Sequence, residues 1–285
     1  MYEYLPLTIA VAGSSIAGLW DLKTTEIPDL IPRTMTIIAL IFWGVYSYLL
    51  HDYSFIINSV LVGGSLFAFG FLMYYAGQWG GGDAKLLSST GFLIPSGLGL
   101  SKLLFPFALS YLVNVFLIGA VYMIGYAAVM ALRDKKIVKD FSYSVKSSSK
   151  IMFGIPVLIF LSFMAFNLFL SRNLGVIQSI TFHIYNSLFI SILSLGLMFT
   201  WKFALSVEKI GFKKKIPVSK VREGDVLESF KYWEGATKEQ VARIKKSGKR
   251  FVVVKDGVRF GPVFPIALLF TIYVGDFIAL FFNTI

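Results

Sequence analysis

The sequence predicts a polytopic α-helical membrane protein with about eight membrane segments, one or two of them short, and a small cytoplasmic α+β lobe before the last segment. Its 285 residues are 56% hydrophobic, with a mean hydropathy of +0.72. Several apolar runs reach about 20 residues, roughly the length that spans hydrocarbon as a helix. Most of the 27 Lys and Arg residues gather in two hydrophilic stretches, as the positive-inside rule predicts for the cytoplasmic side.

The apolar segments follow one another along the whole chain. They cover roughly residues 4–20, 30–50, 54–78, 84–98, 103–132, 151–171, 184–206 and 263–282. The first is interpreted as a retained helix and not a signal peptide, because Glu3 precedes it and Asp21 and Lys23 follow it. The fourth contains Gly91 and Pro95, so we expect a brief helix that ends near Pro95. Short or interrupted segments often line a site.

These segments divide the chain into five parts. The parts are a membrane core at 1–132, a basic cytoplasmic loop at 133–150, two further membrane helices at 151–206, a basic lobe at 207–262 and a final helix at 263–285. If the N-terminus is outside, both basic stretches lie in the cytoplasm, where they meet anionic lipid headgroups. The charge is therefore interpreted as topology, with a place in the cytoplasmic membrane, and not as nucleic-acid binding.

The stretch 207–262 is predicted to fold as a small α+β lobe. Its expected elements are strands at 216–221 and 251–255 and a turn at Asp256-Gly257. Thr237 is typical of an N-cap, and Gln240 stands three residues later as the capping-box partner. The helix is expected to run to about Lys246, where Gly248 ends it.

Two aspartates occur where a membrane helix does not easily keep them. Asp21 ends the first apolar stretch, and Asp83 ends the run Gly80-Gly81-Gly82-Asp83. A carboxylate at bilayer depth costs several kcal/mol and marks a candidate functional site. Both acids fall at the cytoplasmic ends of their segments, so they meet if the first and fourth segments pack together. Two adjacent carboxyls share one proton, so that one can deprotonate water while the other donates to a carbonyl oxygen.

Such a pair of carboxyls needs no cofactor for acid–base catalysis, and the amino-acid composition excludes several other catalytic mechanisms. The chain has no cysteine, which excludes a disulfide, a Cys-based zinc site and a thiol nucleophile. His51 and His183 are interpreted as loop or interface residues and not as metal ligands. The glycines before Asp83 permit the close approach of another backbone, such as a substrate strand. Alternatively they form only a tight helix entry with Asp83 as the N-cap.

Three stretches carry a resemblance to a known family. Gly80-x-Gly82-Asp83-x-Lys85 resembles the GxGD motif of the type IV prepilin peptidases and archaeal preflagellin peptidases. Asp21, followed after five residues by Ile27-Pro28-Asp29, is similar to the first-aspartate motif of that family. The stretch from Gly257 to Pro265 resembles the end of the cytoplasmic lobe and the start of the final helix in archaeal members. Segments 151–206 have no place in the resemblance and are treated as an insertion.

The resemblance implies an aspartic endopeptidase. Its expected substrates are prepilins or preflagellins, from which it would cut short basic leader peptides at the cytoplasmic face. Asp21 and Asp83 would be the catalytic pair, and Gly80 and Gly82 would supply backbone room. Bacterial members also carry a cysteine-rich zinc lobe and methylate the new N-terminus; without cysteine, methyltransferase activity is not implied here.

Four further charged residues receive an interpretation. Glu26 and Asp29 are expected to form an acidic notch for the basic residues of the leader; alternatively Asp29 caps the second helix and Glu26 is solvated. Lys85 is expected to lie away from Asp83 around the helix, as an interfacial lysine whose stem follows apolar surface. Asp276, in the middle of the last segment, is expected to hydrogen-bond within the bundle to a Ser, Tyr or Asn, although a third functional acid is the alternative.

Other functions compete with the peptidase hypothesis. A proton- or cation-coupled transporter would use the same intramembrane acids and broken helices, but it would spread the acids along a path. A presenilin-like protease shares GxGD but usually has a Tyr-Asp pair, whereas Trp20 precedes Asp21 here. A non-catalytic assembly protein of the pilus system is a further alternative, but such a protein would not need an acid at both motif positions.

Overall fold

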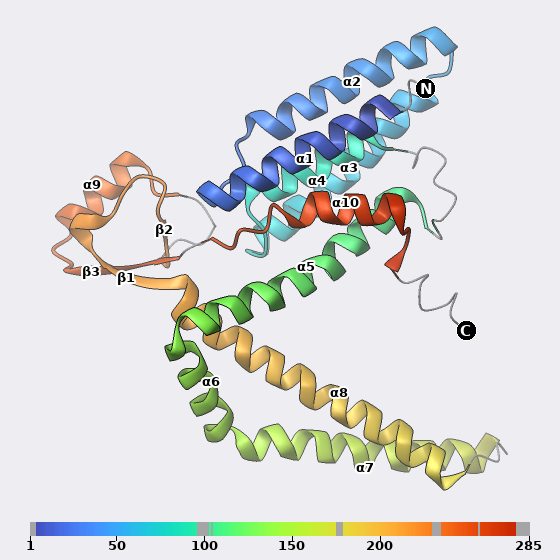
Figure 1. The fold of residues 1–285 in the computed structure, drawn as a ribbon, viewed down its shortest axis with the longest axis vertical. Coiled ribbons are helices and arrows are strands. Elements are labelled where there is room, and N and C mark those ends of the chain that lie inside the picture. The colour runs from blue at the N-terminus through green and yellow to red at the C-terminus, as the bar shows by residue number, and fades with distance from the viewer. Residues whose placement is uncertain are drawn as a thin grey trace. The chain divides into compact units, whose positions relative to one another are not determined.

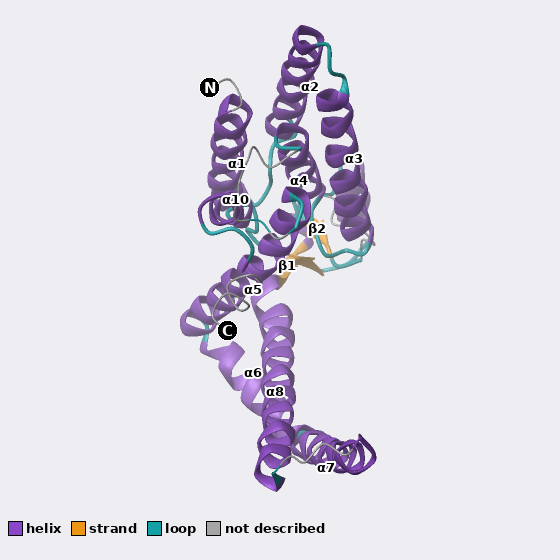
Figure 2. Ribbon diagram, turned by 90° about the vertical axis from the view of Figure 1, so that its right-hand side faces the viewer, coloured by secondary structure: helices purple, strands orange, loops and turns teal. Residues whose placement is uncertain are grey.

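The computed structural model describes residues 4–95, 103, 105–174, 179–229, 235–255 and 257–277. It divides into two compact units, one formed by Met1–Gly125 with Lys214–Ile285 and the other by Tyr126–Lys213. Figure 1 labels the elements, and Figure 2 shows that helices make up most of both units. The predicted segment ends at 96–98 and 278–282, and Asp256 of the predicted turn, lie outside the described residues.

Outside its lobe, the described part of the first unit contains all or part of six helices. They are α1 (Tyr4–Thr24), α2 (Leu30–Leu50), α3 (Ser54–Tyr75), α4 (Gly81–Leu93), α5 (Phe107–Arg133) and α10 (Val263–Tyr273), with α5 continuing into the second unit after Gly125. Across the described residues of both units, six helices are long and apolar enough to cross a membrane: α1, α2, α3, α5, α7 and α8. The polytopic membrane fold is therefore confirmed. The count of eight spans is not, because α4 and α10 have only 13 and 11 residues.

The short helix α4 is the centre of the first unit. It packs against α1, α2 and α3, and most of its side chains from Ala84 to Leu93 are buried. The approach to α3 is close because Gly70 has no side chain: a Cβ there would lie 2.8 Å from the Cα of Ala84. Small residues that let helix backbones approach are typical of packing in membranes.

Neighbouring side chains satisfy the C-terminal end of α4. The last carbonyls of a helix have no partner within it, and an unsatisfied group is costly at membrane depth. Ser59 Oγ donates to the carbonyl of Phe92 at 2.7 Å, and Trp43 Nε1 donates to that of Leu93 at 3.2 Å. The helix thus ends at Leu93, close to the end near Pro95 that the sequence predicts.

The lobe of the first unit is a three-stranded sheet with one helix. The strands β1 (Lys213–Pro217), β3 (Phe251–Lys255) and β2 (Val226–Leu227) lie in that order, and β2 is antiparallel to β3 with Val226 opposite Lys255. A small core of apolar side chains holds it together: Val221, Leu227, Ala236, Val241 and Val254.

The predictions for the lobe are partly confirmed. Helix α9 (Lys238–Lys246) has the predicted capping box: the N–H of Gln240 donates to Thr237 Oγ1 at 3.3 Å, and the N–H of Thr237 donates to Gln240 Oε1 at 2.8 Å. The strand at 251–255 is also confirmed. The strand predicted at 216–221 is wrong beyond Pro217, because Val218–Lys220 forms a 3₁₀ turn.

The second unit contains α6 (Lys135–Ser147), α7 (Ser149–Leu174), α8 (Ile180–Ser206) and a π-helical turn, η2 (Val207–Phe212). Within the basic stretch 133–150, most residues form the amphipathic helix α6 and not a loop. Its start is capped by Asp134, which accepts the N–H of Lys136 at 2.9 Å. His183, interpreted as a loop or interface residue, is buried within α8.

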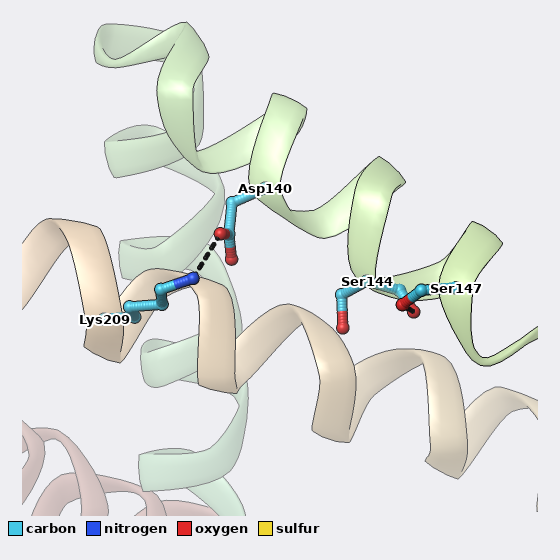
Figure 3. Close-up of polar contacts among 4 residues, drawn as sticks. All are labelled: Asp140, Ser144, Ser147 and Lys209. Atoms are coloured by element: carbon cyan, nitrogen blue, oxygen red, sulfur yellow. Dashed lines mark hydrogen bonds and ion pairs between the residues drawn. The ribbon is translucent and has the colours of Figure 1, made fainter.

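An ion pair joins α6 to η2. Lys209 Nζ lies 2.7 Å from Asp140 Oδ1, while Ser144 and Ser147 occupy the following turns of α6 (Figure 3). The hydrogen bond from the Lys209 ammonium holds the pKa of the Asp140 carboxyl below its ordinary value. One face of α6 also packs against η2 and α5, where Ile137 is buried beside Val207.

Candidate active site

Asp21 lies in the last turns of α1, with its side chain buried. The N–H of Gly261, two residues before α10, donates to its Oδ2 at 2.8 Å. A Cβ at Gly261 would lie 2.7 Å from the Cβ of Asp21, and one at Gly18 would lie 3.0 Å from the Cα of Pro262. The segment that enters α10 therefore runs directly along α1 and supplies a hydrogen-bond donor to this carboxylate.

Asp83 lies in the first turn of α4 and is half-buried. Gly80 is the N-cap residue, and its N–H donates to Asp83 Oδ2 at 3.0 Å. The alternative interpretation, with Asp83 as the N-cap, is therefore wrong: Asp83 is the third helical residue and reaches back to the cap. A carboxylate at this position is favourable, because it meets the unpaired N–H groups and the positive end of the helix dipole.

Gly82 brings the two aspartate motifs into direct contact. A Cβ at this position would lie 2.8 Å from the Cβ of Ile27 and 3.2 Å from its carbonyl oxygen. Ile27 is buried, and Pro28 follows it at the turn into α2. The room left by Gly82 is thus filled by the protein's own first motif, whereas the sequence had suggested room for a substrate strand.

Both aspartates line one cavity of about 530 Å³. Its walls are formed by residues between 21 and 27, by residues 78–83, by Met123 of α5, and by lobe residues that include Asp225, Val226, Lys255 and Val258. The two carboxylates are close enough to interact electrostatically. This cavity, called the aspartate cavity below, has the groups that acid–base chemistry on a bound chain requires.

An aromatic cluster supports the loop before Asp83. Trp79 is buried, and its ring is stacked on Phe116 with centroids 5.6 Å apart. It also meets Phe260 at 6.1 Å and, edge-on, Phe264 at 5.9 Å. The sequence analysis missed Trp79; its position directly before Gly80 was the available signal. The cluster ties the GxGD loop to the start of α10 through side chains with few rotamers.

Thr25 is a strained residue beside this cavity. Its φ of 63° lies in the left-handed region, which a β-branched residue rarely adopts. Its N–H donates to the carbonyl of Asp21 at 2.8 Å, which ends α1 directly after the candidate acid. Strained backbone is often found at functional sites, where the surrounding structure maintains it.

The acidic notch predicted from Glu26 and Asp29 does not form as one site. Glu26 lines the aspartate cavity. Asp29 instead lines a second cavity of about 350 Å³, together with Arg33 and Lys85. Lys85 Nζ lies 2.6 Å from Asp29 Oδ1. Lys85 is indeed half exposed and directed away from Asp83, but its ammonium has a partner, which the sequence analysis did not predict.

Asp276 is buried just after the end of α10. Its Oδ2 accepts the N–H of Phe105 at 3.3 Å. Nearby, Asn114 Nδ2 donates to Thr271 Oγ1 and to the carbonyl of Gly275, both at 2.9 Å. These bonds favour the expected structural role of Asp276.

Part of the chain is similar to proteins of a known family. Residues 8–128 match the model of the type IV leader peptidase family. The match spans the segments that carry both aspartates, and the resemblance stated from the motifs is thereby confirmed for this part of the chain. The family match ends at residue 128, so it does not include the remainder of the second unit or the lobe.

Two curated relatives are similar over a shorter stretch. A preflagellin peptidase of Methanocaldococcus jannaschii is 39% identical over 87 residues, which is 30% of this chain and 37% of the relative. A preflagellin peptidase of Methanococcus maripaludis is 36% identical over 95 residues, 33% of this chain and 40% of the relative. The matched stretches thus span less than half the length of these relatives.

Proposed function

We propose that this protein is a membrane-embedded aspartic endopeptidase that removes short basic leader peptides from preflagellin or prepilin-like substrates at the cytoplasmic membrane face. The observation that carries the proposal is the aspartate cavity, in which Asp21 and Asp83 lie together and each carboxylate is held by a backbone N–H. The family match over residues 8–128 and the names of the two relatives support it.

The proposed chemistry uses the two carboxyls with one shared proton. The ionised carboxylate takes a proton from water as the water oxygen attacks the scissile carbonyl carbon. The protonated carboxyl donates its proton to the carbonyl oxygen, and the C–N bond then breaks as the amine is protonated. The N–H of Gly261 binds Oδ2 of Asp21, and the N–H of Gly80 binds Oδ2 of Asp83. The other oxygen of each carboxylate is available for these proton transfers.

The lobe and the connection after α1 would hold the substrate. The cavity walls combine the two motifs with lobe residues, so an extended leader could contact both. Glu26 lines the aspartate cavity and is proposed to contact basic leader residues, whereas Asp29 lies outside that lining and pairs with Lys85, which supports a different role for it. The exposed lysines of α6 (Lys135, Lys136 and Lys139) are proposed to face anionic lipid headgroups.

A transporter is not favoured. Asp21 and Asp83 line one cavity, and Asp276 accepts a backbone N–H elsewhere in the bundle. A pathway for ions would instead place its acids in series through the membrane.

The test is a cleavage assay in membranes with a preflagellin-like substrate. Wild type, Asp21→Asn and Asp83→Asn are compared with Asp52→Asn, a control in the α2–α3 connection whose carboxylate accepts the N–H of Ser54. Asn retains the shape and an acceptor but cannot transfer a proton. We expect both motif variants to lose cleavage at normal protein levels while Asp52→Asn retains it. Full activity in either motif variant, or no cleavage by wild type of any leader in a panel, would refute the proposal.

A further inference from the structure

An ion pair connects the segments that carry the two aspartates. Lys85 lies two residues after Asp83 in the first turns of α4, and Asp29 immediately precedes α2. Their charged groups meet at 2.6 Å, although 56 residues separate them in sequence. The backbones of the same two segments also touch where Gly82 packs on Ile27. The pair is therefore a second contact, besides Gly82 on Ile27, between the two segments that carry the aspartate motifs.

Asp29 is diverted from the role that its position favours. It is the N-cap residue of α2, where an aspartate usually accepts an N–H from the first turn. Here its side chain makes no capping hydrogen bond and reaches across to α4 instead. The backbone of Asp29 is in the αR region, whereas a capping residue is usually extended, and its carboxylate is therefore available for the bond to Lys85.

Resting on the proposed peptidase function, we propose that Asp29 and Lys85 are a positioning pair that fixes the separation of Asp21 and Asp83. The first turn of α4 begins with Gly81 and Gly82, directly after the N-cap Gly80, and glycine backbones have many accessible conformations. The ion pair fastens that turn to the connection between α1 and α2, and so orients Asp83 toward Asp21. Neither member of the pair contacts substrate in this proposal.

Two features separate this role from general stabilisation or substrate binding. The side chains are 44% and 53% exposed, and exposed ion pairs add little to the stability of a fold. The pair also lines the second cavity and not the aspartate cavity. Breaking it should therefore leave folding and substrate affinity almost unchanged, while the chemical step suffers from a misplaced carboxyl.

The kinetic test compares Asp29→Asn, Lys85→Met, the double variant and Lys85→Arg in the membrane assay. We expect kcat to fall about tenfold or more in each single neutral variant with KM unchanged, since a displacement of about 1 Å can cost about 10²-fold. The double variant should lose no more than either single one, and Lys85→Arg should retain most of the activity. Asp140→Asn is the matched control, since it breaks a 2.7 Å ion pair in the other unit.

A distance measurement tests the same proposal without activity. The chain has no cysteine, so spin labels can be placed at Lys23→Cys and Gln78→Cys, both at exposed positions beside the two motifs. We expect a narrow distance distribution that broadens in Lys85→Met and stays narrow in Asp140→Asn.

The outcomes also distinguish this inference from the proposed function. If wild type cleaves and the single variants keep its kcat, or if the losses multiply in the double variant, the positioning role is wrong and the peptidase stands. If the single variants instead show a raised KM and a reduced preference for basic leaders, Asp29 contacts the substrate and the positioning proposal is wrong. Absence of cleavage by wild type counts against the peptidase itself, and an unchanged label distribution would then reject the pair independently.

Discussion

The contact between Gly261 and Asp21 allows a sharp mutational test of the site. In Gly261→Ala, the new Cβ would lie 2.7 Å from the Cβ of Asp21 and 3.0 Å from its Oδ2. Carbon atoms in contact prefer a separation of about 3.5–4.0 Å, so one partner must move by roughly 1 Å. The three nearest atoms, Cβ, Cγ and Oδ2, all belong to Asp21, and the Cβ is fixed to the backbone of α1, so accommodation of the new methyl group displaces Asp21 from Gly261.

The expected effect on catalysis exceeds that on folding. Overpacking of this kind costs about 1–3 kcal/mol of stability. A displacement of about 1 Å in a reacting group can cost about 10²-fold in rate, which corresponds to about 2.7 kcal/mol in the barrier. Weakening of the 2.8 Å hydrogen bond from the Gly261 N–H adds to this loss. We therefore expect kcat to fall about 100-fold while the protein remains folded in the membrane.

The assay is cleavage of a preflagellin-like substrate, paired with thermal unfolding in detergent. Gly44→Ala is the control, because a Cβ at this position in α2 has nothing within 4 Å. It should retain wild-type kcat and gain up to about 1 kcal/mol of stability, as alanine favours helix over glycine. Wild-type kcat in Gly261→Ala would refute the argument that this segment holds Asp21 in its working position.

Three further predictions follow from named contacts. Gly82→Ala should lower kcat about tenfold or more in the cleavage assay, because its Cβ would meet the first motif at 2.8 Å. Asp276→Asn should keep wild-type kcat and lose about 1 kcal/mol of stability in thermal unfolding, because its bond to a backbone N–H is structural. Lys209 holds the pKa of Asp140 below its ordinary value, so this pair stabilises the fold above pH about 4 and the contribution disappears as pH falls through the native pKa. Lys209→Met should therefore lower stability at pH 7 by at most about 1 kcal/mol and make no difference at pH 2, because the pair is partly exposed.

The sequence predicted the membrane helices because long apolar runs are a strong local signal. The brief helix α4 was also predicted, since Gly91 and Pro95 limit its length. The stretch 133–150 was interpreted by its charge alone, so the amphipathic helix α6 was missed. Strand β2 has only two residues, which is too short for a recognisable alternation.

The acids of the site were predictable, whereas their supporting contacts were not. An aspartate at the end of an apolar run is conspicuous in any sequence, because burial of a charge is costly there. The bond from Gly261 to Asp21 joins residues 240 positions apart, and the pair Asp29–Lys85 joins residues 56 apart. Local patterns contain no information on such pairs, and this is why Asp29 was assigned to a notch with Glu26.

One physical feature unites the two halves of the site. Each carboxylate accepts an N–H at the start of a helix: Gly80 is the N-cap of α4, and Gly261 precedes the N-cap of α10. These two helices are short, with 13 and 11 residues. The first N–H groups of any helix lack partners within it, and a membrane-spanning helix usually exposes them to water. The N–H of the N-cap Gly80 is one of these groups in α4, and the N–H of Gly261 belongs to the segment just before α10; both bonds stabilise carboxylates that would otherwise be costly to bury.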